Sequence, residues 1–451
     1  MSYNTHSFIL FLISLYSFFS SHYASTSRPT GFSAKVINRN SVQSPLYDPS
    51  LTRQDRIKAS VLRSVARHNY IDSITSNKFP PINIPVTPAD GEYIMEYFIG
   101  TPPLSTFALL DTGSSRIWLQ CLPCEKCYPQ TNVSYFDPSK SSTYKRVQCP
   151  LLTCQLYGNE HCSEDNYCQF HVTYADKSVS SGDVAEETVE FRSPKGGNTT
   201  VENFVFGCSH INYFGGDVHY SQWGIPGLIG LRREGQSLIE QLGFLNFAYC
   251  FGDYDVPEQH GYAMFGDVAA ISGPTTPILS ISDAANHYFL DIVDISVNGE
   301  RLKIPPDTFQ VHKEYPSGFA IDSGATFTFL KTKAFRLLVG ALKMKLMKLK
   351  EKEVIDPSYY HFELCYRMNY LDLKFAPVIT FHFVNLDLQL PLSNTWIKVD
   401  EIQKTPYEGV HCLAMIPSPS ISVLGNFQQQ NFHIGFDLDN NLISFSLQFC
   451  E

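Results

Sequence analysis

The chain has 451 residues, of which 43% are hydrophobic, 14% aromatic and 17% charged, and its formal net charge is −10. This length suits about two to three domain-sized units rather than one small core. The composition excludes a disordered or coiled-coil chain and indicates a packed globular protein.

An apolar run from Phe8 to Phe19 opens the chain and is followed by small and polar residues. A run of this length is too short to span a bilayer comfortably and is typical of a secretory signal, so we expect a signal peptide over residues 1–24. No Lys or Arg precedes the run, and a buried core helix is the alternative interpretation. No later segment is apolar enough to span a membrane, and no C-terminal anchor tail is visible. We therefore expect a protein without a stable membrane anchor, secreted to the extracellular or cell wall space, with the vacuole as the alternative.

Residues 28–78 are basic, with nine Lys or Arg against three Asp or Glu, a formal net charge of +6. Residues 79–451 carry −16, because residues 1–27 hold no formal charge and the whole chain is −10. A basic leader on an acidic body predicts a prosegment, placed at residues 25–78, that docks electrostatically and leaves at low pH when carboxylates lose their charge. We expect this prosegment to act as an intramolecular inhibitor.

Within this leader, residues 52–71 have the apolar spacing of an amphipathic helix. The apolar positions are Ile57, Val61, Leu62 and Val65. A solvated surface helix is the alternative interpretation. The Pro-rich segment 79–88 that follows indicates a linker where processing occurs.

The chain has twelve cysteines, and seven of them lie between Cys121 and Cys168. An even count in a secreted chain predicts a disulfide framework. The alternative is a zinc half-site in the CxxCxxC stretch that begins at Cys121, but no second CxxC or HxxxH lies at the required spacing, so we predict no metal site. Sequons at Asn132 and Asn198 predict glycosylation.

From Gly91 onward the pattern is mostly that of strands, and residues 379–383 and 386–390 alternate apolar and polar side chains with period two. Helical patterns are few, at 237–242 and 333–354. The second is Lys-rich, which indicates a solvated helix face rather than a membrane or nucleic-acid site. The sequence predicts an all-β-dominated body with minor helices.

A weak internal repeat divides this body. Residues 107–119 resemble residues 318–330, because each has an apolar strand, then Asp–hydroxyl–Gly, then a second apolar stretch. Later in each half an apolar pair is followed by Gly, at 228–230 and at 423–425. The repeat predicts two copies of one lobe, each of which presents one Asp.

A single Asp-[Ser/Thr]-Gly tripeptide is weak evidence, because Asp and Gly favour surface turns. Two of them in matching contexts, at Asp111 and Asp322, are much less expected by chance. Two carboxylates held about 3 Å apart cannot both ionise readily, so they share a proton. The charged one can take a proton from an attacking water, and the neutral one can donate to the carbonyl oxygen of a peptide. We therefore predict that this pair hydrolyses peptide bonds.

The residues that flank the two Asp suit this chemistry. Gly113 and Gly324 are expected to let the backbone approach closely and to bring N–H groups toward the carboxylates. Thr112 and Ser323 offer hydroxyls that could tie the two loops together across a pseudo-dyad.

Together these features resemble the pepsin-like aspartic peptidases, and in particular the plant nepenthesin-like group with its cysteine-rich insert. The resemblance runs from about residue 31 to the C-terminus. It is carried by DTGSS at 111–115, WLQC at 118–121, YADKSVSSGD at 174–183, GLIGL at 227–231, DSG at 322–324, VLGNFQQQNFHIGFD at 423–437 and the leader at 31–50.

The resemblance implies a bilobal pepsin-like acid protease fold, all-β dominated, with two pseudo-symmetric β lobes, minor helices and a substrate cleft between the lobes. The N-terminal lobe, with the cysteine-rich insert, is expected at 79–272 and the C-terminal lobe at 273–451. The implied activity is that of an aspartic endopeptidase that acts on polypeptides and needs no metal or organic cofactor. We expect a monomer that binds no nucleic acid.

At single residues the resemblance implies that Asp111 and Asp322 are the catalytic pair. Tyr174 matches the flap tyrosine that closes over substrate, and Trp118 matches the tryptophan that usually hydrogen-bonds it. For the cysteines, the pattern of the group implies the pairs Cys121–Cys124, Cys127–Cys208, Cys149–Cys168, Cys154–Cys162, Cys250–Cys450 and Cys365–Cys412. At the flap, Ala175 and Lys177 stand where many relatives carry glycine.

Ala325 also departs from the family pattern, because a Thr or Ser usually stands there and donates to the second Asp. Without that hydrogen bond the pKa of Asp322 should rise. The sequence therefore predicts that Asp322 holds the shared proton. Asp111, which has hydroxyl partners in Thr112 and Ser114, is then the readily ionised member.

Two other functions compete with this interpretation. A catalytically silent pepsin-like homologue would act as a protein-binding or inhibitor module, but such proteins typically lose a catalytic Asp or its glycine. An actin-like ATPase also carries a DxG loop in each of two halves, yet it needs an α/β body and a reducing compartment. The strand-rich pattern and the cysteine cluster argue against the ATPase.

Overall fold

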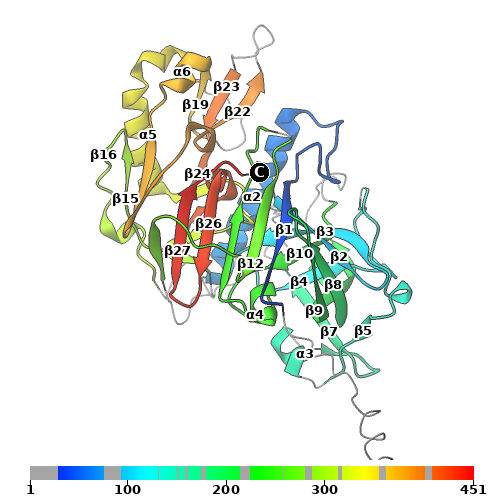
Figure 1. Ribbon diagram of the computed structural model, residues 1–451. Coiled ribbons are helices and arrows are strands. Elements are labelled where there is room, and N and C mark those ends of the chain that lie inside the picture. Colours follow the sequence, from blue (N-terminus) through cyan, green and yellow to red (C-terminus); the bar gives the residue numbers. More distant parts are fainter. Residues whose placement is uncertain are drawn as a thin grey trace, which may run out of the picture.

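The computed structural model describes residues 29–75, 93–130, 132–149, 152–157, 161–173, 179–213, 224–256, 258–279, 287–312, 317–354, 362–401 and 409–450. The predicted signal peptide and the whole of the predicted linker at 79–88 lie outside these residues. Strands dominate the chain, as the sequence predicts, and Figure 1 shows them in two halves joined by a central group of strands.

The first half consists of short and long strands with a few minor helices. The strands are β2 (Tyr93–Ile99), β3 (Leu104–Asp111), β4 (Ile117–Gln120), β5 (Lys145–Arg146), β6 (His161–Cys162), β7 (Cys168–Thr173), β8 (Val179–Arg192), β9 (Asn198–Tyr213) and β10 (Gly227–Gly230). The helices are η1 (Pro138–Lys140), α3 (Leu152–Tyr157) and α4 (Leu238–Leu242). Helix α4 is the helix predicted at 237–242, and Ser237 caps it by accepting from the Glu240 N–H.

The second half has a comparable make-up. The strands are β14 (Phe289–Leu290), β15 (Ile292–Val297), β16 (Glu300–Arg301), β17 (Phe319–Ile321), β18 (Thr328–Lys331), β19 (Cys365–Met368), β20 (Ile379–Phe383), β21 (Leu386–Gln389), β22 (Trp396–Glu401), β23 (Gly409–Leu413), β24 (Met415–Ser418) and β25 (Ser422–Leu424). The helices are η3 (Pro306–Thr308), α5 (Thr332–Lys345), η4 (Met347–Lys352), α6 (Tyr370–Lys374), η5 (Leu392–Asn394) and α7 (Asn426–Gln429). The alternating segments predicted near 380 and 388 are β20 and β21, which pair with each other.

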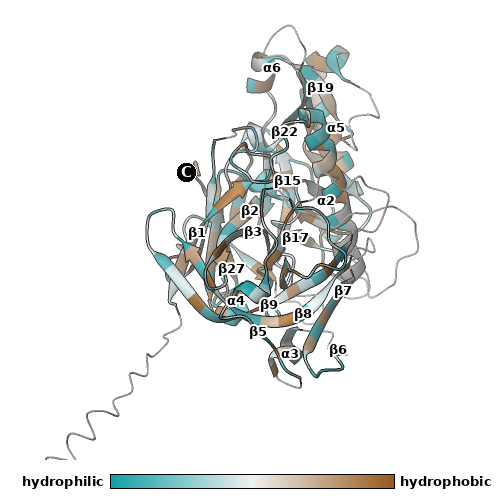
Figure 2. Cartoon of the chain, turned by 90° about the vertical axis from the view of Figure 1, so that its right-hand side faces the viewer, coloured by the Kyte–Doolittle hydropathy of each residue, from teal (hydrophilic) through white to brown (hydrophobic). Residues whose placement is uncertain are grey.

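Helix α5 begins the Lys-rich segment predicted as a solvated helix. It buries Phe335, Leu338 and Leu342, while its lysines and Met344 lie on the outside. Figure 2 shows hydrophobic and hydrophilic residues sharing this helix, as expected for one that packs on one face only.

The internal repeat appears directly in the strand pairing. Strand β10 pairs in parallel with β3, with Gly230 beside Asp111, and it also pairs antiparallel with β4. In the second half β25 pairs in parallel with β17 and antiparallel with β18. Each Asp loop therefore connects two strands that flank a third, and the two apolar-pair–Gly segments predicted from the repeat supply that third strand.

The central strands join the two halves. Strand β11 (Asn246–Cys250) pairs with β12 (Gly261–Gly266) and with β26 (Phe432–Asp437). Strand β26 continues to β27 (Leu442–Leu447), which pairs with β13 (Thr275–Leu279). Aromatic side chains fill the space over these strands, and Phe247 stacks on Phe436 with ring centroids 4.2 Å apart.

The leader is an integral part of this fold. Strand β1 (Gly31–Asn38) inserts between β12 and β2 and pairs antiparallel with both. Its Ala34 and Val36 are fully buried, and Phe32 stacks on Phe191 with centroids 3.9 Å apart. Because β1 covers one edge of β12 and one edge of β2, it stabilises the rest of the sheet while the leader is in place.

The amphipathic helix predicted at 52–71 is α2 (Arg53–Thr75). It is not a solvated surface helix: Ile57 and Val61 are fully buried in a cluster with Phe327 and Phe427. Leu62, predicted for the apolar face, is instead 40% exposed. Figure 1 shows α2 in blue between the two halves of the molecule.

All twelve cysteines are paired, but four of the six predicted pairs are wrong. The structure has Cys121–Cys208, Cys124–Cys127, Cys149–Cys162 and Cys154–Cys168, together with the predicted Cys250–Cys450 and Cys365–Cys412. The first correction follows from strand pairing, because β4 runs in parallel beside β9 and delivers Cys121 next to Cys208. No cysteine among the described residues is free, so the CxxCxxC stretch has no thiol left for zinc.

Two further findings concern surfaces. In the described part of the chain, no helix is both long and apolar enough to cross a membrane. Asn132 and Asn198 of the two sequons are both exposed, and their glycosylation stays a prediction.

Candidate active site

The two catalytic candidates meet at the centre of the molecule. Asp111 is the last residue of β3, and Asp322 directly follows β17. Both carboxylates are fully buried. The N–H of Gly113 donates to Asp111 Oδ1 at 2.9 Å, and the N–H of Gly324 donates to Asp322 Oδ1 at 2.9 Å. The two loops are therefore built in the same way, which follows from the sequence repeat.

The two glycines are required by space. A Cβ on Gly113 would lie 2.9 Å from Asp322 Oδ1, and a Cβ on Gly324 would lie 2.6 Å from Asp111 Oδ1. Each loop thus lacks a side chain where the carboxylate of the other loop approaches. Any larger residue would push the two carboxylates apart.

The predicted hydroxyl tie between the loops is present. The Thr112 N–H donates to Ser323 Oγ at 2.9 Å, and the Ser323 N–H donates to Thr112 Oγ1 at 2.9 Å. Ser323 Oγ in turn donates to the carbonyl oxygen of Leu110 at 2.8 Å. This reciprocal pair fixes one loop against the other, so the distance between the carboxylates does not depend on the lobes alone.

Ser114 and Asn426 differ from expectation. Ser114 Oγ accepts a long hydrogen bond of 3.5 Å from the Arg116 N–H, and it does not support Asp111. Asp111 Oδ2 is buried with no hydrogen-bond partner among the described residues. Asn426, in the NFQQQ stretch, donates from Nδ2 to the Ser323 carbonyl oxygen at 2.9 Å, a support that the sequence did not single out.

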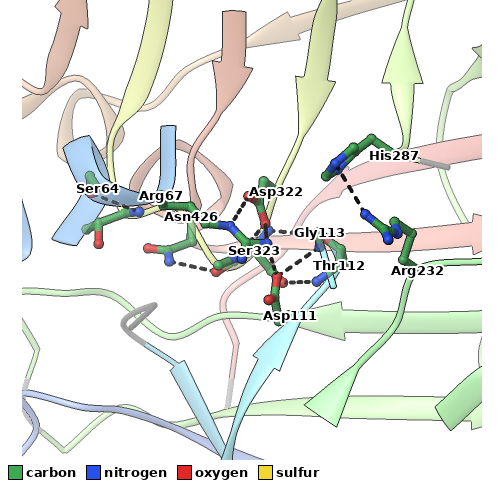
Figure 3. A network of polar contacts seen from close by, with 12 residues as sticks. Ser64, Arg67, Asp111, Thr112, Gly113, Arg232, His287, Asp322, Ser323 and Asn426 are labelled. Carbon is green, nitrogen blue, oxygen red and sulfur yellow. Dashed lines mark hydrogen bonds and ion pairs between the residues drawn. The ribbon is translucent and has the colours of Figure 1, made fainter. Parts of the chain in front are cut away.

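Arg67 of the leader occupies the site, as Figure 3 shows. Its Nη2 lies 2.5 Å from Asp111 Oδ1, and its Nε lies 2.8 Å from Asp322 Oδ2. The Arg67 side chain is only 3% exposed. One guanidinium therefore bridges both carboxylates, a fork geometry that suits Arg better than Lys. A buried cation between two buried carboxylates compensates their charge.

The residues around Arg67 hold α2 in place. Ser64 Oγ accepts from the N–H groups of Thr326 and Phe327, both at 3.1 Å, on the strand side of the second Asp loop. His68 Nε2 lies 3.0 Å from the Ile421 carbonyl oxygen and 2.8 Å from Ser418 Oγ. Helix α2 thus buries polar residues as well as its apolar face. Its docking depends on a specific match rather than on hydrophobic contact alone.

The electrostatics reverse the predicted order of ionisation. Burial raises the pKa of Asp111 to about 6, helped by the charge of Asp322 and opposed by Arg67. Burial also acts to raise the pKa of Asp322, but the charge and hydrogen bonds of Arg67 outweigh it and lower that pKa below its usual value. Arg67 donates to both oxygens of Asp322 and to one of Asp111, which explains the asymmetry. With the leader bound, Asp322 is therefore the more readily ionised member, whereas the sequence predicts from Ala325 that Asp322 holds the shared proton.

Of the predicted flap tyrosine Tyr174 and its predicted hydrogen-bond partner Trp118, only Trp118 is described. It lies in β4, 9% exposed, in a cluster with Tyr128 and Tyr157. Tyr174 lies outside the described residues, as do Ala175 and Lys177. The predicted contact between Trp118 and Tyr174 stays a prediction.

Comparison with known sequences places both halves in one family. Residues 93–267 match the family model described as xylanase inhibitor N-terminal, and residues 287–447 match the one described as xylanase inhibitor C-terminal. A probable aspartic protease of Arabidopsis thaliana is 33% identical over 98% of this chain and 98% of its own length. The aspartic proteinase nepenthesin-2 of Nepenthes gracilis is 32% identical over 88% of this chain and 86% of its own length.

Solved structures share the fold at lower identity. The structure titled edgp superposes with a TM-score of 0.65 at 18% identity, over 94% of this chain and 96% of that chain. Basic 7S globulin from soybean superposes with a TM-score of 0.59 at 18% identity, over 81% of this chain and 97% of that chain. These likenesses describe the architecture alone.

Proposed function

The chain belongs to the pepsin-like aspartic protease family, and from this premise we propose that it is a secreted aspartic endopeptidase made as an inactive precursor. The observation that carries the proposal is the buried pair Asp111 and Asp322, supported by matching glycines and bridged by Arg67 of the leader. A catalytic pair that is complete but occupied is what a protease precursor requires.

The chemistry follows once Arg67 leaves. Two buried carboxyls held together by the Thr112–Ser323 tie then share one proton, and a water can lie against both. The ionised carboxyl takes a proton from that water as it attacks the peptide carbonyl carbon. The neutral carboxyl donates to the carbonyl oxygen, and a proton is later passed to the leaving amine. The pair titrates as a unit, so either residue can hold the shared proton.

The leader's fit supports the precursor part of the proposal. Strand β1 is paired on both edges, and α2 brings its buried cation to the dyad. A peptide substrate needs the same position, because its scissile carbonyl must lie at the two carboxylates. Leader and substrate are therefore mutually exclusive.

Compartment and processing are also proposals. Six disulfides among the described residues support an oxidising compartment, the extracellular or cell wall space, with the vacuole as the alternative. We propose a monomer that acts on polypeptides after the leader is cut in the Pro-rich segment 79–88.

A second candidate is a catalytically silent protein-binding module, and one observation favours it. The matching family models are described as xylanase inhibitor domains, so the family includes members with a binding role. Against it, both loops retain Asp, Gly and the hydroxyl tie, a costly arrangement of buried charges for a protein that does not use them.

The test is hydrolysis of an unfolded protein by the purified chain between about pH 3 and 6, with and without the aspartic protease inhibitor pepstatin. We expect cleavage that pepstatin blocks. A folded wild-type protein that loses its leader and still cleaves nothing would favour the binding module.

The position of Ala325 gives a prediction on pH dependence. Ala325 is fully buried beside the second loop, and its N–H donates weakly to the Asp322 carbonyl oxygen at 3.4 Å. A hydroxyl there would donate to the ionised Asp322 carboxylate and lower its pKa. We expect the acidic limb of the pH profile of kcat/KM to move to lower pH in Ala325→Thr, by about half a unit to one unit. The measurement compares mature wild-type and variant enzymes on one peptide, and coincident profiles would contradict the prediction.

A further inference from the structure

A buried arginine and histidine lie beside the catalytic pair without a part in the mechanism above. Arg232 follows β10, and its N–H donates to the Ser114 carbonyl oxygen at 2.9 Å, in the loop that follows Asp111. His287 precedes β14, and the carbonyl oxygen of its neighbour Tyr288 accepts from the N–H of Ile321 at 3.0 Å, one residue before Asp322. Backbone hydrogen bonds thus hold Arg232 next to the first Asp loop and the segment of His287 next to the second.

Figure 3 shows where this pair lies. Arg232 and His287 are together on one side of the Asp pair, whereas Ser64 of the leader and Asn426 are on the other side in this view. His287 interacts electrostatically with Asp322 and with Arg67, which places it close to the dyad. A substrate that lies across the dyad in place of the leader would therefore pass beside the pair.

Arg232 and His287 are buried, and each has a nitrogen without a hydrogen-bond partner among the described residues. Arg232 is 8% exposed and His287 is 5% exposed with α2 in place. Among the described residues, Arg232 Nε and His287 Nδ1 are buried with no hydrogen-bond partner. Arg232 Nη1 lies 3.5 Å from His287 Nε2, a contact between two basic groups. Burial and the charge of Arg232 lower the pKa of His287 to about 3, so the imidazole is neutral and Arg232 carries the charge alone.

The carboxylate that pairs with Arg232 in the structure, that of Glu234, can be replaced by another. Glu234 accepts from Arg232 Nη2 at 2.5 Å, and the Glu234 side chain is 46% exposed. A carboxylate that is almost half in solvent can turn outward when a second carboxylate takes its place, because the buried Arg232 guanidinium, 10% exposed, then keeps an anionic partner. Its present position shows that the guanidinium can donate to a carboxylate whose side chain is partly in solvent.

We propose that Arg232 and His287 form a specificity subsite that binds an acidic side chain of the peptide substrate near the scissile bond. The inference rests on the proposed protease function and deepens it by naming a substrate preference. A Glu or Asp carboxylate takes the place of Glu234 on the Arg232 guanidinium, which can offer two parallel N–H groups. A neutral side chain cannot replace Glu234 as the anion on Arg232, so Arg232 Nε and His287 Nδ1 stay unpaired and the hydrogen bonds of the acidic substrate are not gained.

The experiment compares peptides that differ only as Glu or Gln, one position at a time on both sides of the scissile bond, at a fixed pH of about 5.5, where Glu is ionised. For the mature wild-type enzyme we expect kcat/KM to favour Glu by about tenfold or more at one position. In Arg232→Gln this ratio is expected to fall to near one. The matched control is Arg233→Gln, since Arg233 is exposed and donates to Asn441 Oδ1 at 2.7 Å, and it should keep the wild-type ratio.

A second variant tests the subsite independently, in case Arg232→Gln does not fold. Glu234→Gln changes an exposed residue and removes the competing carboxylate, so it is expected to increase the preference for Glu. A Glu-to-Gln ratio that is one in the wild type, or that is unchanged in both Arg232→Gln and Glu234→Gln, would overturn the subsite while leaving the protease function intact. A wild-type enzyme that cleaves no peptide of either series would instead overturn the proposed function, and the subsite with it.

Discussion

Replacing Asp111 with Asn is expected to reduce kcat for peptide hydrolysis by about 10⁴-fold or more, because the pair then lacks one of its two ionisable groups. Asn has the shape of Asp and can still accept from the Gly113 N–H, which donates to Oδ1 at 2.9 Å in the structure. The fold should therefore be retained while the proton transfer is lost. The measurement is the initial rate on one peptide, with thermal unfolding of both proteins recorded in parallel.

Asp322→Asn provides the matched control for this prediction. The two loops have the same geometry, so the two variants should lose activity to a similar extent. The double variant should be little worse than either single one, since residues that act as a unit are strongly non-additive. Activity that survives in Asp111→Asn at more than a few per cent would contradict the aspartic mechanism.

The catalytic loops were predictable because their chemistry is local. A strand, a turn with Gly and a hydroxyl neighbour recur twice in the sequence, and the strand pairs β3–β10 and β17–β25 recur with them. Thr112 and Ser323 could be assigned a mutual tie because each stands directly after its Asp. Local identity and a repeat were sufficient for these positions.

The role of Arg67 was not predictable in the same way. The apolar spacing of residues 52–71 indicated a helix, but a helix with one apolar face is normally expected to expose the opposite face. Here Arg67, which lies outside the apolar face, is also buried, because α2 packs against the two Asp loops. The available signal was the excess of positive charge in the leader against the acidic body. The charge difference predicts that the leader is attracted to the body, but it does not identify Arg67 as the residue that contacts the two Asp.

The ionisation order and the disulfides failed for a common reason. Both depend on placement finer than sequence spacing can give. The sulfurs of Cys149 and Cys154, which belong to two different disulfides, are only 3.8 Å apart, so small shifts decide which partner each takes. Likewise the pKa values of the two Asp depend on which oxygens Arg67 meets, and Arg67 belongs to a distant part of the chain.

In Arg67→Ala we expect the leader to detach from the catalytic pair at a pH where the wild-type leader stays bound. Arg67 acts to lower the pKa of both carboxyls, so docking of α2 is favoured when both are ionised. That contribution is fully present above the pKa values that the pair has without Arg67. It is lost as the pH falls through the pKa of Asp322, which Arg67 holds below its usual value. The wild-type leader should therefore hold at neutral pH and detach progressively in acid.

Without Arg67 the two buried carboxylates have no cation, and the docked helix should weaken by about 100-fold or more at neutral pH. We expect the intact Arg67→Ala precursor to cleave a reporter peptide, and to lose its leader, near neutral pH, where the wild-type precursor does neither. Arg53→Ala is the matched control, because Arg53 lies on the same helix and pairs with Asp255 at 2.5 Å, with side chains 32% and 43% exposed. An exposed pair of this kind contributes at most about 1 kcal/mol, so its loss should barely move the pH of leader release. Equal shifts in the pH of leader release in the two variants would mean that the overall charge of α2 holds the leader. The contact of Arg67 with the two carboxylates would then not be what keeps the leader bound.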